Sequence, residues 1–224
     1  SSDFADVPAG IGGGWDGFRG TPQLVRMFDY QDNANPKANE ILDKRGIFYD
    51  KNRSIDITTS VTGTFTTEGW SVYKYTNIRS DGQPGSNTTF PDTDFPMFRL
   101  ADIYLMYAEA VARGGQGGSL ATAVEYVNAL RKRAYGNTSH EVNEAWLTEN
   151  NYRNLLDERC RELYWEGTRR TDLIRYGLFT SADYLWTFKG GVLGGTGVSN
   201  RYNVFPIPTT DLSVNGNLKQ NEGY

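Results

Sequence analysis

The chain has very little of the chemistry on which most catalytic and metal sites depend. Of its 224 residues, one is a cysteine, Cys160, and one is a histidine, His140. A single cysteine forms no intramolecular disulfide. A lone histidine in a polar loop is more often solvated than catalytic or metal-bound. Cys160 falls on an apolar helical stripe, so we expect a buried, inert thiol.

Long apolar runs and an excess of positive charge are absent too. No run of eighteen apolar residues occurs, so we expect no membrane-spanning helix. The net charge of −4 argues against a nucleic-acid binder. The opening SSDFADVPAG has neither the basic nor the apolar region of a signal peptide, and it does not begin with Met. We therefore expect a fragment of a longer protein.

The composition that is present, 38% hydrophobic and 13% aromatic, is that of a folded chain. Residues 1–97 are rich in Gly, Asn, Asp, Ser and Thr, and they predict loops with short strands at 55–59, 63–67 and 71–75. Residues 179–224 predict loop and extended structure, because a Gly-rich run and the prolines of YNVFPIP disfavour regular elements.

Residues 98–178 predict two helical hairpins, which make this a mainly α protein. The first pairs 98–113 with a helix capped by Ser119, and the second pairs 148–166 with 169–176. The apolar stripe predicted for the first helix is Leu100, Ile103, Tyr104, Tyr107, Ala108 and Val111. Tetratricopeptide-like units of this size need about three repeats to bury their faces. We therefore expect further helices, in a longer chain or in a partner.

The stretch 157–175 is dense in charge, with every cation an arginine. Arginine suits bidentate, partly buried ion pairs, and neighbouring arginines lower a carboxyl pKa, which is unsuitable for a general acid. Several acids and arginines also lie three or four residues apart. The predicted pairs are Asp157–Arg161, Glu158–Arg161, Glu166–Arg169, Glu166–Arg170 and Asp172–Arg175. We therefore predict a structural ion network rather than catalytic carboxylates. Its predicted members are Asp157, Glu158, Arg161, Glu162, Glu166, Arg169, Arg170, Asp172 and Arg175.

Loop aromatics suggest a binding site. Trp15 and Trp186 lie in Gly-flanked loops, where an indole face offers rigid apolar area that suits a sugar ring. Each of these aromatics could instead pack against the edge of a core. With neighbouring polar and aromatic groups, the predicted ligand-binding residues are Trp15, Asp16, Arg19, Tyr184 and Trp186.

Cofactors are not indicated, with one weak exception. Residues 29–40 resemble a twelve-residue calcium loop, with Asp29, Asn33 and Glu40 at ligand positions. Ala34 stands where the sharp turn of such a loop favours glycine. A polar surface loop is the simpler interpretation, and a structural calcium ion is the alternative.

A set of segments together resembles the SusD/RagB family of outer-membrane nutrient-binding lipoproteins from Bacteroidetes, in its C-terminal half. The segments are GWSVYKY, FRLADIYLMYAEA, AVEYVNALRKRA, LLDERCRELYWEGTRRTDLIRYG, VFPIPTTDL and NGNLKQNEGY. The resemblance covers most of the chain from Gly69 onward, and the set is specific although no single motif is. It implies part of a SusD-like α/α superhelix, with 1–97, 98–178 and 179–224 as parts of one C-terminal domain.

The resemblance also implies a function. It predicts a non-enzymatic protein that binds glycans and passes them to a SusC-like TonB-dependent transporter. It places the protein on the surface of the outer membrane, held by a lipid anchor on the N-terminal half that this sequence lacks. The alternatives are peptide capture on the same fold, a glycoside hydrolase using two helix carboxylates, and a structural subunit that docks a transporter.

Overall fold

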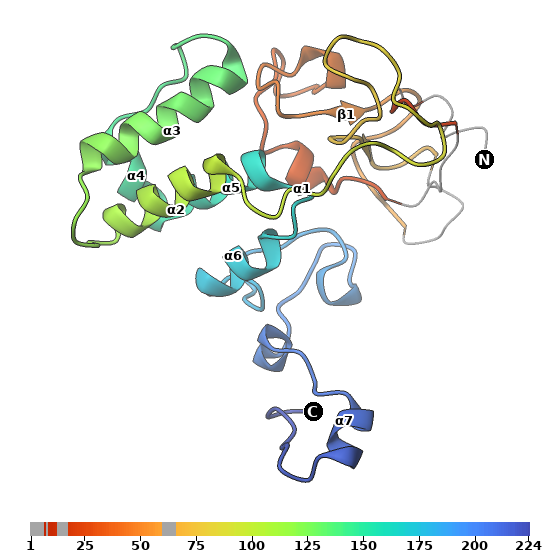
Figure 1. Cartoon of the computed structure of the whole chain (residues 1–224), viewed down its shortest axis with the longest axis vertical. Helices are drawn as coiled ribbons and strands as arrows, with labels where there is room; N and C mark the ends of the chain where they lie inside the picture. Colours follow the sequence, from red (N-terminus) through yellow and green to blue (C-terminus); the bar gives the residue numbers. More distant parts are fainter. Residues whose placement is uncertain (1–6, 8, 13–17, 60–65) are drawn as a thin grey trace. The chain divides into compact units, whose positions relative to one another are not determined.

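The computed structural model describes residues 7, 9–12, 18–59 and 66–224 of the chain. The chain divides into two compact units, Ser1–Arg169 and Arg170–Tyr224. The predicted fold class is confirmed, because the chain is mainly helical with few short strands (Figure 1). Among the described residues, no helix is long and apolar enough to cross a membrane.

The first unit contains the predicted first hairpin. Helix α2 (Leu100–Ala112) and helix α3 (Leu120–Tyr135) lie side by side (Figure 1). Ser119 caps α3, since its hydroxyl accepts a hydrogen bond from the Thr122 N–H at 3.1 Å. The hairpin packs on α4 (Glu144–Thr148) and α5 (Arg153–Leu163). The buried core of this helical part consists of Ala101, Leu105, Ala108, Ala123, Val127, Leu130, Leu147 and Leu155.

The predicted stripe on α2 is partly wrong. Leu100 and Ile103 are 62% and 48% exposed, whereas Ala101 and Leu105 face the core. The reason is that α2 is apolar on most of its circumference, so periodicity alone cannot choose the face that a neighbour covers. The helical hairpin buries one face of α2 and leaves an apolar strip exposed.

The predicted helix 148–166 is also wrong as a single element. The segment η4 (Glu149–Tyr152) interrupts it, because Asn150, Asn151 and Tyr152 all have positive φ angles, between 53° and 63°. Asparagine tolerates this left-handed conformation better than most residues do. The chain therefore turns between α4 and α5, and α5 begins at Arg153.

The loop-rich part of this unit has a core of its own. Strand β1 (Phe48–Tyr49) pairs antiparallel with β2 (Ser71–Val72), next to α1 (Pro22–Val25) and η2 (Ala38–Glu40). The strand predicted at 71–75 is therefore confirmed in part, and the one at 55–59 is wrong. Most of 63–67 lies outside the described residues. The buried core consists of Val25, Phe28, Tyr30, Phe48, Trp70, Val72 and Tyr164. Tyr164 directly follows α5, so the end of this helix packs against the loop-rich part.

The second unit is a series of short turns and helices. It begins within α6 (Arg169–Arg175). This helix ends, as predicted, before Gly177, whose φ is +70°. Short 3₁₀ helices η5 (Lys189–Gly191) and η6 (Asn200–Asn203) and helix α7 (Thr209–Val214) complete it. The buried Lys189 joins the turns between Leu178 and Tyr184 through hydrogen bonds to their carbonyls.

Candidate functional site

An aromatic pocket of about 450 Å³ lies within the second unit. One of the predicted ligand-binding residues, Trp186, is in its wall. Phe205 and Tyr224 are among the other lining aromatics, and both are exposed. The lining is Arg170, Phe179, Trp186, Lys189, Gly190, Val198, Tyr202, Val204, Phe205 and Tyr224. A mostly apolar concavity with a few polar groups is the usual form of a small-ligand site.

Trp186 is held by aromatic neighbours. Its ring stacks on Phe179, with the centroids 6.0 Å apart and the planes at 29°. Tyr184, another predicted site residue, is its second aromatic neighbour, with the ring centroids 6.5 Å apart and the planes at 59°. The structure thus brings Tyr184 and Trp186 together, and of the two Trp186 lines the pocket.

Lys189 fixes the loop that carries these two aromatics. Its side chain is buried, and its ammonium donates to the backbone carbonyls of Leu178, Ser181 and Tyr184 at 3.2, 2.6 and 2.7 Å. The ammonium also lies 4.5 Å from the centroid of the Trp186 ring. Burial lowers the pKa of the lysine. Three carbonyls and an indole face therefore surround one cation, which sets the loop conformation.

Arg170 lies over two aromatic rings that line the pocket. Its guanidinium carbon is 4.1 Å from the Phe205 ring centroid and 5.0 Å from that of Phe179. It also donates to the carbonyl of Tyr202 at 2.7 Å. The sequence placed Arg170 in an ion network, paired with Glu166, but its described contacts are with aromatic faces and a carbonyl. The helical spacing could not show this, because Phe205 and Tyr202 are distant in sequence.

The end of the chain closes the pocket. The Tyr224 hydroxyl donates to the carbonyl of Val204 at 3.0 Å, and the Arg201 guanidinium donates to the carbonyl of Gly223 at 2.8 Å. Arg201 also lies over the rings of Tyr202 and Tyr224. Sequence reasoning missed these residues, although the aromatics and arginine of RYNVF and the terminal tyrosine were a usable signal.

The other predicted ligand-binding residues are not brought to this pocket by the structure. Trp15 and Asp16 lie outside the described residues. Arg19 belongs to the first unit, where its guanidinium donates to the carbonyl of Glu68 at 3.1 Å and its backbone bridges to Ser71. A role in ligand binding for these three residues stays a prediction.

The predicted charged stretch builds a network around Glu158. Three guanidinium groups, those of Arg45, Arg131 and Arg161, each lie 2.7 Å from this fully buried carboxylate. Arg161 is the partner that helical spacing predicts. Arg45 comes from the loop-rich part and Arg131 from α3, so one carboxylate joins three segments.

Glu162 and Glu166 extend the network toward the surface. Glu162 contacts Arg45 at 3.1 Å, Arg99 at 2.9 Å and Arg133 at 2.5 Å. Glu166 contacts Arg99 at 2.8 Å and Lys74 at 2.5 Å. The pairs predicted for Glu166 with Arg169 and Arg170 are replaced by these tertiary partners.

The remaining members lie at the edge of this network. Arg169 is 4.0 Å from Asp157, and Arg175 pairs with Asp172 at 2.9 Å, as its spacing predicts. Arg159, which the prediction left out, pairs with Asp102 of α2 at 2.7 Å. The Arg159–Asp102 pair connects α5 with α2, the Arg169–Asp157 pair connects α5 with the first residue of α6, and the Arg175–Asp172 pair lies within α6.

The charge state of the central carboxylates follows from these contacts. Burial alone would raise the pKa of Glu158, but Arg161, Arg45 and Arg131 outweigh it and hold that pKa below its usual value. Burial is likewise outweighed at Glu162, whose pKa is lowered by Arg133, Arg45 and Arg99. Carboxylates held ionised in this way are poor general acids, which argues against the hydrolase alternative.

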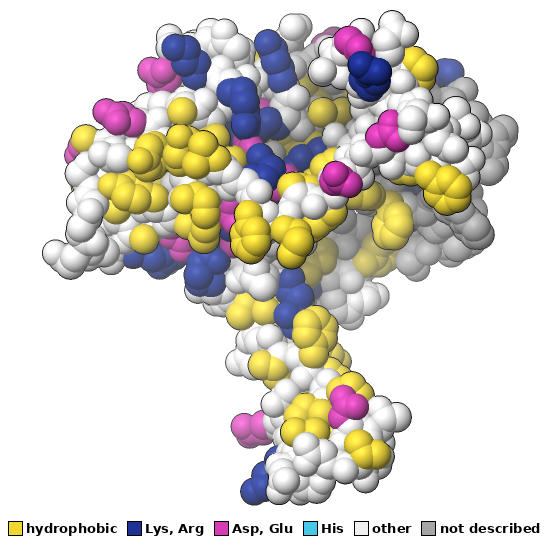
Figure 2. Space-filling model, in the orientation of Figure 1, with side chains coloured by type: hydrophobic (Ala, Val, Ile, Leu, Met, Phe, Trp, Pro, Cys, Tyr) yellow, Lys and Arg dark blue, Asp and Glu magenta, His cyan; other side chains and the backbone are white. Residues whose placement is uncertain are grey.

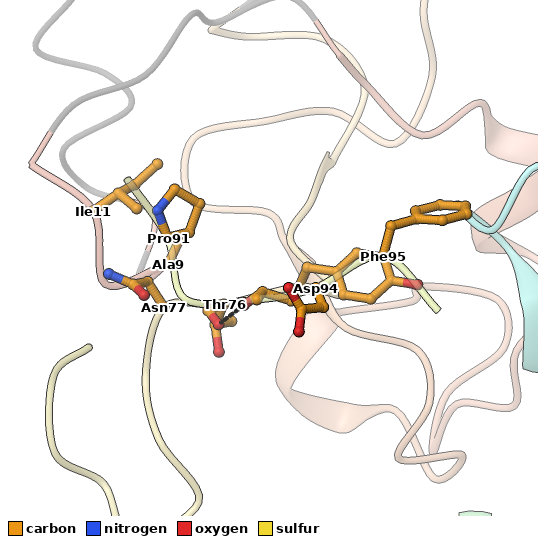
Figure 3. Close-up of a pocket in the computed structure, with 9 residues that line it drawn as sticks. Ala9, Ile11, Thr76, Asn77, Pro91, Asp94 and Phe95 are labelled. Atoms are coloured by element: carbon orange, nitrogen blue, oxygen red, sulfur yellow. Dashed lines mark hydrogen bonds between the residues drawn. The ribbon is translucent and has the colours of Figure 1, made fainter. Parts of the chain in front are cut away.

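A second pocket, of about 280 Å³, lies among the loops of the first unit. Figure 3 shows Ile11 and Pro91 at one end of it and Phe95 at the other. The Thr93 hydroxyl donates to the carbonyl of Thr76 at 2.9 Å, which ties two of its walls together.

The residues of the predicted calcium loop have protein partners. The Asp29 carboxylate accepts a hydrogen bond from the Tyr135 hydroxyl, and Glu40 pairs with Lys37 at 3.4 Å. The Asn33 amide oxygen accepts from the Tyr30 N–H at 3.2 Å. Calcium binding stays a prediction, which the melting temperature in CaCl₂ against EDTA would test.

The fold and the pocket define a mainly helical protein with an aromatic site on ordered loops. The chain belongs to the SusD family, whose sequence model matches residues 50–224. Over 158 residues it is 50% identical to the starch-binding protein SusD of Bacteroides thetaiotaomicron, covering 70% of this chain and 26% of the relative. A SusD-like protein of Formosa agariphila is 35% identical over 138 residues, covering 57% and 24%. The chain thus spans about a quarter of the length of these relatives.

Solved structures agree with this assignment. Surface glycan-binding protein A of Bacteroides thetaiotaomicron superposes with a TM-score of 0.51 at 28% identity, over 70% of this chain and 31% of that one. Its complex with laminarihexaose gives a TM-score of 0.50 at 28% identity, over 69% and 31%. A SusD-like protein of Bacteroides fragilis shares the fold, with a TM-score of 0.60 at 20% identity over 94% of this chain and 48% of that one. The predicted SusD-like fold is confirmed.

Proposed function

We propose that this chain is the glycan-binding part of a non-catalytic nutrient-capture protein. The observation that carries the proposal is the aromatic pocket around Trp186, in a chain 50% identical to a starch-binding protein over 158 residues. The structure of a similar protein with bound laminarihexaose supports the same class of ligand. Peptide capture is the alternative that the same fold leaves open.

The pocket suits a sugar for physical reasons. The faces of Trp186, Tyr202 and Phe205 offer flat apolar area to the C–H face of a pyranose ring. Arg170 and the tyrosine hydroxyls at the rim supply hydrogen bonds that orient the sugar hydroxyls. Lys189 sets the position of Trp186 before ligand arrives, which reduces the ordering cost of binding.

The wider cellular role is also a proposal. Membership of the SusD family supports a place on the outer-membrane surface and delivery of the glycan to a SusC-like TonB-dependent transporter. In this proposal an N-terminal half, outside the present sequence, carries the lipid anchor. Binding without chemistry is supported by the ion pairs that keep Glu158 and Glu162 ionised.

The test is retardation on native gels cast with a panel of polysaccharides. The wild-type chain should be retarded on at least one glycan, and Trp186→Ala should lose that retardation with an unchanged melting temperature. Trp165→Ala is the matched control, because Trp165 is an exposed tryptophan of the first unit. Equal retardation of the Trp186→Ala variant would contradict the pocket assignment. Binding of peptides by a wild-type chain that no glycan retards would favour the peptide alternative.

A further inference from the structure

A third pocket, of about 350 Å³, opens in the first unit where the helical hairpin meets the loop-rich part. Figure 2 shows Lys and Arg side chains gathered in the hollow between these two parts. The charged residues that line it are Lys44, Arg45, Lys74, Arg99, Arg133, Glu162 and Glu166. Five cations thus face two carboxylates.

The neighbouring carboxylates do not remove this excess. Glu162 and Glu166 are already shared among Arg45, Arg99, Arg133 and Lys74. Two further acids pair with Arg45. Asp43 lies 2.6 Å from it, and Glu158 also pairs with Arg131 and Arg161, which do not line the pocket. The connected cluster therefore has four acidic side chains and six basic ones, and Lys44 adds a seventh positive charge next to it. The six basic residues are Arg45, Lys74, Arg99, Arg131, Arg133 and Arg161. Such a local excess in a chain of net charge −4 attracts an anion.

Two of these cations are accessible. Lys44 is exposed, and within the described part of the chain its ammonium has no ion-pair or hydrogen-bond partner. It lies beside Gly136, the residue that ends α3. The Arg133 side chain is 54% exposed and shares one carboxylate, Glu162, with two other arginines. Among the described residues Arg133 bonds to Glu162 through Nη2 alone. Lys44 and the other guanidinium nitrogens of Arg133 can therefore approach a ligand without breaking that contact.

The remaining wall is apolar. Ile47, Tyr75 and Pro96 line it, so the pocket has a ring face and aliphatic surface next to its cations. The Tyr75 hydroxyl is buried and has no hydrogen-bond partner among the residues that the structure describes. An inorganic anion would contact the cations but gain nothing from the apolar wall. A ligand with both a charged group and a C–H face would contact the cations and the apolar wall together.

We propose that this pocket is an anion-binding subsite that takes the carboxylate of an acidic sugar, a uronic acid. Its carboxylate would meet Lys44 and Arg133, and its ring would lie against Tyr75 and Pro96. The sugar part of this inference rests on the proposed glycan-binding function. The subsite is separate from the Trp186 pocket, because every residue that lines it belongs to the first unit.

Isothermal titration of the full chain with digalacturonate tests the inference, with a neutral galactose disaccharide as the matched ligand. The acidic sugar should bind about tenfold more tightly or better, and its affinity should fall as NaCl is raised. Lys44→Gln should weaken binding about three- to tenfold, the effect of one charge-assisted contact at an accessible site. Lys132→Gln on α3 removes an exposed charge that does not line the pocket, and it should leave the affinity unchanged.

Two further arms separate the possible failures. Sodium sulfate at equal concentration should compete weakly, and sulfate that binds as tightly as the uronate would overturn the sugar assignment. Trp186→Ala should leave digalacturonate binding intact. Equal affinity for the acidic and neutral sugars, or equal loss in Lys44→Gln and Lys132→Gln, overturns the proposed subsite. Retardation of the chain by a neutral glycan, abolished by Trp186→Ala, would leave the proposed function standing in that case.

Discussion

Arg45 and Glu158, 113 positions apart in the sequence, form a buried ion pair with Nη1 and Oε1 2.7 Å apart. Their side chains are 9% and 0% exposed. The pair joins the loop-rich part of the first unit to helix α5, and Arg131 joins α3 to the same carboxylate. A buried network of this kind adds little net stability over apolar packing, but removing one partner leaves buried charges unmatched.

Glu158→Gln is expected to destabilise the chain strongly. The variant keeps the shape of the side chain but leaves the guanidinium groups of Arg45, Arg131 and Arg161 without their shared anion. The expected loss of unfolding free energy is about 3–5 kcal/mol, measured by urea denaturation. Glu125→Gln, an exposed change on α3, should stay within about 0.5 kcal/mol of the wild type. Equal stability of the two variants would contradict the network.

Stability should fall in acid. The pKa values of Glu158 and Glu162 are held below their usual range, because arginines outweigh the effect of burial. The unfolded chain therefore takes up protons first as pH falls through about 4.3, the ordinary glutamate pKa. The network's contribution is complete above that pH and is lost progressively toward the lower folded-state values.

The measurement is the unfolding free energy between pH 7 and pH 3. Glu162→Gln should show a shallower decline than the wild type below about pH 4.5, since it has one depressed carboxyl fewer. Glu125→Gln should keep the wild-type slope. A Glu162→Gln curve parallel to the wild type throughout would show that this carboxyl is not stabilised by its arginines.

Lys189→Met should loosen the loop that carries Trp186. The carbonyls of Leu178, Ser181 and Tyr184 lose their shared donor, a change that costs about 1–3 kcal/mol. Tryptophan fluorescence should shift to the red, and glycan retardation should weaken as in Trp186→Ala. Lys219→Met, an exposed change in the same unit, is the control. Unaltered retardation of the Lys189→Met variant would remove the positioning role of this lysine.

The exposed apolar strip on α2 should bind hydrophobic dyes. Leu100, Ile103 and Met106 are its helical members, and Met97 and Phe98, just before the helix, are exposed too. Figure 2 shows a band of hydrophobic side chains over the helical part of the molecule. We propose that further helices, in the part of the relatives' length that this chain does not span, cover the strip. The triple change Leu100→Gln, Ile103→Gln and Met106→Gln should lower dye fluorescence severalfold without lowering the melting temperature.

The control for that prediction is a triple change at exposed positions of α3, Glu125→Gln, Ala129→Gln and Lys132→Gln. It should leave the dye signal unchanged. A longer chain that includes the preceding helices should show the low signal of the α2 variant. Equal dye binding by the longer and shorter chains would argue that those helices do not cover α2.

Several elements follow from local rules, which is why the sequence predicted them. Ser119 begins α3 and Gly177 ends α6, because a hydroxyl cap and a left-handed glycine act within one turn. The pair Glu158–Arg161 is equally local, since helical spacing alone brings the two side chains together. Family-specific segments from Gly69 onward identified the fold, because several motifs in one order carry more information than any single one.

Long-range contacts decided the rest. Which face of α2 is buried depends on α3 and α5, so its apolar periodicity could not show that Leu100 and Ile103 stay exposed. Arg45 and Arg99 belong to the ion network although they are distant from α5 in sequence. Arg170 lies over the ring of Phe205 instead of pairing with Glu166 as predicted. A helix fixes neighbours within four residues, whereas a pocket is made of side chains whose approach depends on the packing of whole segments. The sequence alone therefore determined the first helical hairpin, the local pairs and the family, and the tertiary structure determined the two pockets proposed as ligand sites.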